Sequence, residues 1–220
     1  MIWIHPSYNT EKNLFTHQFM LYCPIMNTIS LLVYLFATVC AIMVAYIWVR
    51  GIEYAWCILV KHQAPFVASS HNQRKATAAQ INQYYKNAKT IIEVGSGYGG
   101  LARYIARHTN KKVIGLENMP FCVCVARFFD FFSFGKSRTE FCDAFKYFQT
   151  TRKRIDVVVA YLGPTLTPKL LKYRKKIKVL ISLNFEIPNI TPTRIIDLRR
   201  GSVLYGGKKY PHKLFIYEFR

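Results

Sequence analysis

A run of 37 residues without a formal charge, residues 13–49, constrains the fold of this chain more than any other feature. Its most apolar part, Ile25–Val49, would span about 37 Å as a helix at ~1.5 Å per residue, against a hydrocarbon core about 30 Å thick. Tyr46 and Trp48 lie near its end, where interfacial aromatic residues are common, and Arg50 ends the run. The sequence therefore predicts one transmembrane helix over residues 25–49.

Two other interpretations of this segment fit less well. A signal peptide would have a basic start, a shorter apolar core and a small-residue cleavage site. A buried helix of a soluble protein would show a polar face at helical spacing, and this run shows none. Lys12 precedes the segment, whereas Arg50 and Lys61 follow it. This modest bias predicts a single-pass protein of the cell (inner) membrane whose C-terminal domain is cytoplasmic.

The charge of the chain lies almost wholly on the C-terminal side of the apolar segment. Residues 1–49 sum to zero, so residues 50–220 carry the whole formal net charge of +20. Half of the chain is apolar, which excludes an intrinsically disordered protein. No CxxC pair and no His cluster with ligand spacing is present, so we expect neither a disulfide scaffold nor a metal site.

The sequence divides into four parts. We expect an N-terminal segment (1–24), the transmembrane helix (25–49), interfacial helices (50–88) and a catalytic domain (89–220). Residues 51–60 continue the helix along the interface, and Ala64-Pro65 breaks it. Ser69 or Ser70 can cap the next helix, predicted over residues 71–88.

From Lys89 onward, strands alternate with helices, which indicates an α/β fold with a mostly parallel sheet. Ligands of such sheets bind beyond the carboxyl ends of the strands. We expect helices over residues 101–109, 121–132 and 166–176. We expect seven strands over residues 90–94, 112–116, 139–142, 155–161, 179–183, 203–205 and 214–219, the last two as antiparallel edge strands.

The string from Glu93 to Gly100, EVGSGYGG, joins the first strand to the first helix of this domain. Glycines let the chain turn and let a ligand approach the backbone, and the helix N-terminus offers free N–H groups. Glu117 follows the second strand, where an acid can accept hydrogen bonds from both hydroxyls of a ribose. Asp143 follows the third strand and could accept from an adenine amino group, or could merely cap a helix over residues 144–149.

The string also satisfies the dinucleotide pattern G-x-G-x-x-G, but the surrounding residues argue against that ligand. Glu93 would repel a pyrophosphate, whereas it suits a cationic amino group or sulfonium. The 132 residues from Lys89 to Arg220 are too few for a dinucleotide domain plus a catalytic domain. Glu93, Gly95, Gly97, Glu117 and Asp143 instead match the S-adenosylmethionine (SAM) site of class I methyltransferases, which have a Rossmann-like seven-stranded sheet.

Further motifs make the sequence similar to one methyltransferase family. It resembles the membrane-anchored lysine methyltransferases that modify the adenine nucleotide translocase and the ATP synthase c subunit, and their bacterial relatives. The resemblance rests on PFVAS at 65–69, GLENMP at 115–120, CDAF at 142–145, VVVAYLGPTLTPK at 157–169 and SLNFEIPNITP at 182–192. Tyr98 and Gly100 depart from the family pattern, which has an acid and an arginine there.

The resemblance implies a SAM-binding set and an acceptor side. The SAM-binding set is Glu93, Gly95, Gly97, Gly99, Glu117, Asn118, Asp143 and Ala144. On the acceptor side, Tyr161 could orient a lysine amine, Asn184 and Phe185 could line its slot, and Glu186 could hold the protonated lysine before transfer. Ordinary packing at strand ends is the alternative for these acceptor-side residues.

The sequence leaves the methyl acceptor open. The resemblance and the membrane segment favour a lysine in a membrane-embedded or membrane-proximal protein. The basic charge would suit the anionic headgroups of the lipid bilayer, but equally the phosphates of a nucleic acid. An RNA or DNA methyltransferase, a lipid methyltransferase and an inactive membrane scaffold with this fold are therefore alternatives.

Overall fold

The computed structural model describes residues 8–59, 67–133 and 135–219, and the chain divides into two compact units between His62 and Gln63. The described part of the first unit is one helix, α1 (Tyr8–Leu59). Within α1, Asn27–Ile52 is long and apolar enough to cross a membrane, with a mean hydropathy of 2.3. The hydroxyl of Thr38 donates to the carbonyl of Tyr34 at 2.8 Å, so this polar group is satisfied within the helix.

The helix expected over residues 25–49 is therefore present, and it continues to Leu59, as expected for the residues that follow it. At its N-terminal side it is longer than expected, because it includes residues 8–24, for which the sequence alone predicts only an N-terminal segment. The break expected at Ala64-Pro65 lies outside the described residues.

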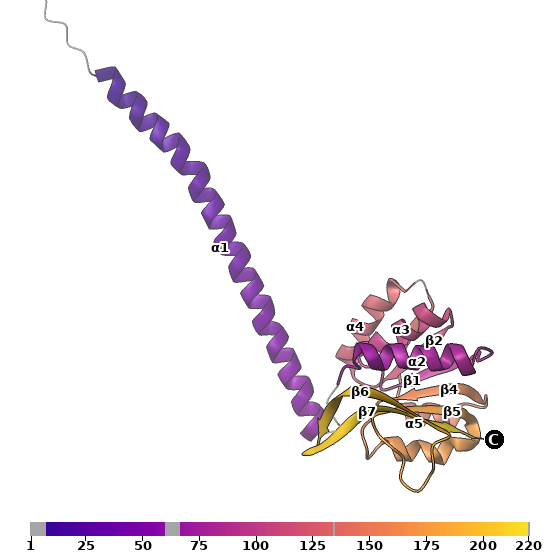
Figure 1. The fold of residues 1–220 in the computed structure, drawn as a ribbon. Coiled ribbons are helices and arrows are strands. Elements are labelled where there is room, and N and C mark those ends of the chain that lie inside the picture. The colour runs from indigo at the N-terminus through magenta and orange to yellow at the C-terminus, as the bar shows by residue number, and fades with distance from the viewer. Residues whose placement is uncertain (1–7, 60–66, 134, 220) are drawn as a thin grey trace, which may run out of the picture. The chain divides into compact units, whose positions relative to one another are not determined.

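The second unit is built on a seven-stranded sheet with strand order β3-β2-β1-β4-β5-β7-β6 (Figure 1). Five strands are parallel, and the antiparallel β7 separates β5 from β6. The bounds of the strands are β1 Ile91–Val94, β2 Val113–Glu117, β3 Ser137–Phe141, β4 Ile155–Ala160, β5 Ile177–Leu183, β6 Arg194–Tyr205 and β7 Lys208–Glu218.

Helices cover both faces of the sheet (Figure 1). One face carries α2 (His71–Tyr84), α3 (Gly100–Thr109) and α4 (Pro120–Phe131). The other face carries α5 (Ala144–Thr150) and the 3-10 segment η1 (Thr167–Lys176). The two apolar cores lie above and below the β1, β4 and β5 strands, whose mainly apolar sequences are typical of strands buried on both faces.

The expected fold class, a Rossmann-like sheet with a parallel core, is confirmed, and three details differ. Helix α2 ends at Tyr84 rather than at residue 88, because a turn precedes β1. Segment η1 is a 3-10 helix rather than an α-helix. The last two strands form a long hairpin in which only β6 is an edge, because β7 pairs with β5 as well.

Helix α2 belongs to the sheet unit through contacts at both of its ends. Ser70 caps its first turn in a capping box, in which the Gln73 side chain accepts a hydrogen bond from the backbone N–H of Ser70. At the other end the guanidinium of Arg194, from β6, lies 3.8 Å from the ring centre of Tyr84. In the first turn of α2, Gln73 Nε2 also donates to Asn184 Oδ1 at 2.8 Å, which places this turn beside the carboxyl end of β5.

Candidate functional site

The glycine-rich loop after β1 turns by using backbone conformations that favour glycine. Gly95, Gly97 and Gly99 have φ values of 69°, 52° and 69°. A Cβ on Gly95 would lie 2.6 Å from Leu162 Cδ2, so a side chain there would collide. The backbone N–H groups of Gly95 and Ser96 donate to the carbonyl of Leu116 at 2.9 and 3.2 Å. The loop is thereby fixed against the end of β2, and it leads into the N-terminus of α3.

Glu117, the last residue of β2, is joined directly to this loop. Its buried carboxylate accepts hydrogen bonds from the backbone N–H groups of Gly97 at 2.7 Å, Asn118 at 2.7 Å and Met119 at 2.9 Å. Glu117 therefore braces the glycine loop as well as standing at the predicted position of a ribose acceptor. Asn118 is half-buried, and it contacts the Glu117 carboxylate through its backbone N–H.

Asp143 lies one strand further along the same edge of the sheet. Its Oδ1 accepts from the backbone N–H groups of Phe145 at 2.8 Å and Lys146 at 3.0 Å, so it caps α5. The capping alternative is thus confirmed, while a contact with adenine stays a prediction. Ala144, the first residue of α5, packs against the core on that face of the sheet.

Glu93, in the third position of β1, is a buried acid that lacks a full set of partners. It is 5% exposed, and its Oε2 has no hydrogen-bond partner within the described part of the chain. Burial raises the pKa of Glu93 to about 8, and the negative Glu117 adds to this, while the backbone N–H of Ala102 and the cation of Arg74 act in the opposite direction. A buried carboxyl group with a perturbed pKa beside a glycine-rich loop is a candidate for a functional site.

Arg74, from α2, is a candidate site residue that sequence reasoning missed. Its Nε donates to the hydroxyl of Ser69 at 3.0 Å, and one of its terminal nitrogens lies 3.2 Å from where a Cβ on Gly100 would stand. The lysine methyltransferase pattern that the sequence resembles has an arginine at the position of Gly100. In this chain the glycine leaves room for a guanidinium that reaches the start of α3 from another helix.

The acceptor-side residues Tyr161 and Asn184 form one hydrogen-bonded group. Asn184, which is buried and has a left-handed φ of 67°, donates from Nδ2 to the Tyr161 hydroxyl at 3.1 Å. Its Oδ1 accepts from Gln73 Nε2 at 2.8 Å. Burial raises the pKa of the Tyr161 hydroxyl, which hydrogen bonds with Gln73 and Asn184 partly oppose. Gln73 was not predicted, because its role depends on the capping turn of α2.

Aromatic rings surround this group. The rings of Tyr161 and Phe185 stack at 5.9 Å, and Phe185 meets Tyr205 and Tyr210 of the β6–β7 hairpin edge-on at 5.8 and 5.0 Å. Glu186 is exposed, and across the described residues no hydrogen bond or ion pair joins it to Tyr161 or Asn184. The structure thus groups Tyr161, Asn184 and Phe185, but it leaves Glu186 at the surface.

Among the described residues, no three His, Cys, Asp or Glu side chains lie close enough together to hold a metal ion.

We expect Glu93 to make the stability of the sheet unit depend on pH. Because the folded pKa is about 8, above the ordinary value of 4.5, the folded state binds more protons than the unfolded state between these values. The free energy of unfolding should therefore fall as the pH rises from about 4.5 to 8, by at most about 1.4 kcal/mol per pH unit, and then level off. Pulse proteolysis in urea at several pH values measures this slope.

The variant Glu93→Gln should lose most of the slope, whereas Glu140→Gln, at a half-buried site on β3, should keep it. A Glu93→Gln protein with the wild-type slope would contradict the assignment.

Comparison with known proteins identifies the fold. No protein-family model and no curated protein matches the chain. Several solved structures match the sheet unit. An RNA methyltransferase from Salinibacter ruber, in complex with S-adenosyl-L-homocysteine, is 18% identical over 70% of this chain and 94% of that chain, with a TM-score of 0.56.

Two further solved methyltransferase structures are similar to this chain. A putative O-methyltransferase from Klebsiella pneumoniae is 14% identical over 71% of this chain and 84% of that chain, with a TM-score of 0.53. An O-methyltransferase from Bacillus cereus, in complex with SAH, is 15% identical over 76% of this chain and 87% of that chain, with a TM-score of 0.52. The sheet unit of this chain therefore has the Rossmann-like fold of class I methyltransferases.

Proposed function

We propose that this chain is a membrane-anchored, SAM-dependent methyltransferase that methylates lysine side chains of proteins in or beside the membrane. The observation that carries the methyltransferase assignment is the glycine loop braced by Glu117 beside the buried, incompletely bonded Glu93. Class I methyltransferase structures with the bound product SAH share this fold.

The residues at the strand ends fit the chemical groups of SAM. Glu117 would accept from the ribose hydroxyls, Asp143 would lie near the adenine, and the unpartnered Oε2 of Glu93 would accept from the amino group. Arg74 would bind the carboxylate of the methionyl part. SAM supplies an electrophilic methyl group on a sulfonium.

Tyr161 and Asn184 provide a rigid place for an acceptor amine. The Tyr161 hydroxyl is held by Asn184, and Asn184 by Gln73, so three elements fix its position. From there it can orient an amine N–H, which leaves the nitrogen lone pair for the methyl group. The aromatic rings of Phe185, Tyr205 and Tyr210 suit a lysine chain and its cationic, methylated product.

Glu186 would act earlier than these residues. An exposed carboxylate at the end of β5 can attract a protonated lysine, which must lose its proton before transfer. The reference pKa of lysine is about 10.4, and removal from water among aromatic rings lowers it.

The membrane assignment rests on the long apolar helix and on charge. Asn27–Ile52 of α1 can cross a bilayer by length and composition. The basic excess follows that segment, which favours a single-pass protein of the inner membrane with a cytoplasmic methyltransferase domain. A membrane anchor would restrict the domain to acceptors at the membrane and raise their effective concentration.

A nucleic acid is the second candidate acceptor, because the formal net charge of +20 would also attract phosphates. Basic runs lie at residues 169–178 and 194–209. Incubating the full chain with radiolabelled SAM and membrane fractions, with and without ribonuclease, distinguishes these acceptors. We expect label in protein, recovered as methyl-lysine after hydrolysis. Label in RNA or extracted lipid would contradict the lysine acceptor, and no SAM binding at all would contradict the enzyme class.

A further prediction concerns Arg74. Because its guanidinium would bind the carboxylate, Arg74→Gln should weaken SAH binding roughly 10- to 100-fold. Binding of 5′-methylthioadenosine, which lacks the amino-acid part, should stay nearly unchanged. Isothermal titration calorimetry of the full chain in detergent measures both. Arg107→Gln, in the exposed last turn of α3, is the control. Equal losses for both ligands would show that Arg74 shapes the loop instead.

A further inference from the structure

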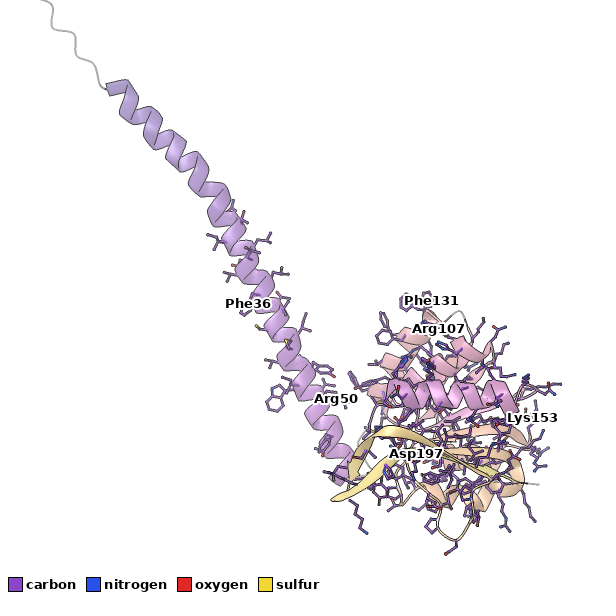
Figure 2. All side chains as sticks on the ribbon, viewed as in Figure 1. Phe36, Arg50, Arg107, Phe131, Lys153 and Asp197 are labelled. Carbon is purple, nitrogen blue, oxygen red and sulfur yellow. The ribbon has the colours of Figure 1, made fainter. Side chains whose placement is uncertain are left out.

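Helix α4 presents an apolar face to solvent and a carboxylate to the interior. Its buried residues are Cys122, Val123, Ala126 and Asp130. Its last turn and the residue after it expose four phenylalanine side chains: Phe128 by 64%, Phe129 by 47%, Phe131 by 82% and Phe132 by 58%. Figure 2 shows Phe131 projecting outward from the domain. We name these four residues the phenylalanine face.

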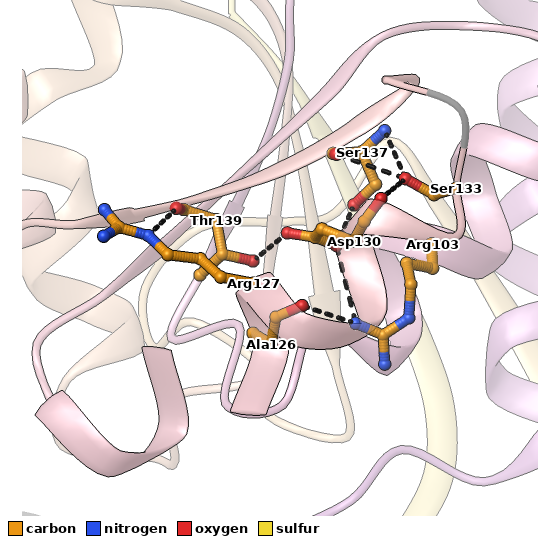
Figure 3. A network of polar contacts seen from close by, with 7 residues as sticks. All are labelled: Arg103, Ala126, Arg127, Asp130, Ser133, Ser137 and Thr139. Carbon is orange, nitrogen blue, oxygen red and sulfur yellow. Dashed lines mark hydrogen bonds and ion pairs between the residues drawn. The ribbon is translucent and has the colours of Figure 1, made fainter. Parts of the chain in front are cut away.

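A polar network fixes the rotation of α4 that exposes these rings (Figure 3). The buried carboxylate of Asp130 accepts from the hydroxyl of Ser137 at 3.0 Å and from that of Thr139 at 2.7 Å, and Arg103 lies 3.5 Å away. Ser133 closes the turn by donating to the carbonyl of Asp130 at 2.6 Å. Turning the rings inward would break this network, so their exposure is built into the fold.

The four rings form one continuous patch. The centres of Phe128 and Phe129 lie 5.3 Å apart, those of Phe128 and Phe132 5.7 Å, and those of Phe131 and Phe132 5.5 Å. A cluster of exposed large rings on one helix end is typical of a surface that meets a partner or a membrane.

Cationic side chains accompany the patch. Arg127 is exposed next to Phe128, and the guanidinium of Arg103 lies 5.2 Å from the ring centre of Phe129. In the turn after α4, Lys136 donates to Asn110 Oδ1 at 2.6 Å. Arg138, at the start of β3, has a side chain that is 78% exposed. Over residues 120–141 the acids are Asp130, which is buried, and Glu140, which lies 3.5 Å from Arg138.

We propose that the phenylalanine face enters the headgroup region of an anionic lipid bilayer, so that the methyltransferase domain itself binds the membrane. Apolar rings flanked by Arg and Lys are the composition of interfacial membrane segments. In a symmetric contact with a second copy, the same cations would face each other, which disfavours that occupant. The proposed membrane anchor would hold a bilayer within reach.

Docking in this way leaves the candidate site uncovered. Helix α4 starts after the carboxyl end of β2, beside Glu117, and runs back toward the start of β3. Its last turn therefore lies at the opposite edge of the sheet from the glycine loop. The bilayer would contact the amino-end edge of the domain only on the face that carries α4, while the loop stays accessible to SAM.

Tryptophan fluorescence in vesicles tests this proposal on the full chain. The tryptophans of the chain are Trp3, Trp48 and Trp56, so the sheet unit has none. The variant Phe131→Trp places a reporter in the patch, and Lys153→Trp places one at an exposed position on the loop between α5 and β4 (Figure 2). The wild-type chain supplies the background emission. Vesicles of phosphatidylcholine, with or without phosphatidylglycerol, carry a brominated lipid as quencher.

We expect the Phe131→Trp emission to shift to shorter wavelength and to be quenched by the brominated lipid, more strongly with phosphatidylglycerol. Lys153→Trp should show neither change. Adding Phe128→Ser to Phe131→Trp should lower the docking equilibrium roughly 10- to 100-fold, because one buried ring is lost. Phe131→Trp emission unaffected by brominated lipid would overturn the proposal. A blue shift that depends on protein density instead of lipid would assign the patch to a second copy and would overturn it too.

Discussion

Replacing Glu117 by alanine should weaken SAH binding by about 100-fold or more. The proposed bonds to the ribose hydroxyls are charge-assisted, and such bonds contribute about 1.5–3 kcal/mol. In addition, the backbone N–H groups of Gly97, Asn118 and Met119 would lose their acceptor. The glycine loop would then lose its link to β2, so the effect should exceed that of removing the ribose contact alone.

Calorimetric titration of the full chain with SAH measures this change. Glu140→Ala, on the neighbouring strand β3, is the control. Glu140 is half-buried, and it forms an ion pair with Arg138 at 3.5 Å rather than a contact with the glycine loop. The isosteric Glu117→Gln keeps one acceptor oxygen, so it should weaken SAH binding less than Glu117→Ala does. Its amide nitrogen cannot accept from an N–H, so the loop should be disturbed in this variant as well. Unchanged SAH affinity in Glu117→Ala would remove Glu117 from the proposed site.

The sheet and its candidate cofactor residues could be predicted because they follow local rules. Strands buried on both faces have apolar runs in their sequences, such as Val157–Ala160 in β4, and the glycine string marks the turn after the first strand. In a parallel sheet, the residues after successive strands share one edge. This places Glu93, Glu117 and Asp143 along the same side without knowledge of the tertiary contacts.

The parts that could not be predicted depend on contacts between distant segments. Arg74 and Gln73 lie on a polar helix that looks unremarkable in sequence, and they reach the site only because α2 packs beside the strand ends. Glu186 was grouped with Asn184 because the two are close in sequence. The left-handed backbone at Asn184 turns the chain there, and Glu186 is exposed.

The phenylalanine face was missed for a related reason. The string RFFDFF predicts a helix end but does not show which of its side chains face the sheet. Asp130 faces inward because Ser137 and Thr139 on β3 supply hydroxyl donors to it, and the four rings are exposed. Hydrogen bonding to a buried carboxylate therefore decides which side of α4 faces the sheet.

Replacing Asp130 by alanine should accordingly destabilise the sheet unit by about 3–4 kcal/mol. The change leaves Arg103 without its carboxylate and two buried hydroxyl groups without their acceptor, and breaking a buried pair costs about this much. Asp130→Asn keeps one acceptor oxygen and should cost about half as much. Asp197→Ala, which removes an exposed ion pair to Lys213 at 3.7 Å, should change the stability by less than about 0.5 kcal/mol.

Pulse proteolysis of the full chain in urea compares these variants, since the sheet unit has no tryptophan to report its unfolding. The order Asp197→Ala, Asp130→Asn, Asp130→Ala in increasing loss of stability is the expected result. If Asp130→Ala were as stable as the wild type, α4 could turn without cost, and the exposure of the phenylalanine face would not be imposed by the fold. A large loss would instead mean that the polar network stabilises the domain against the cost of keeping four aromatic rings at its surface.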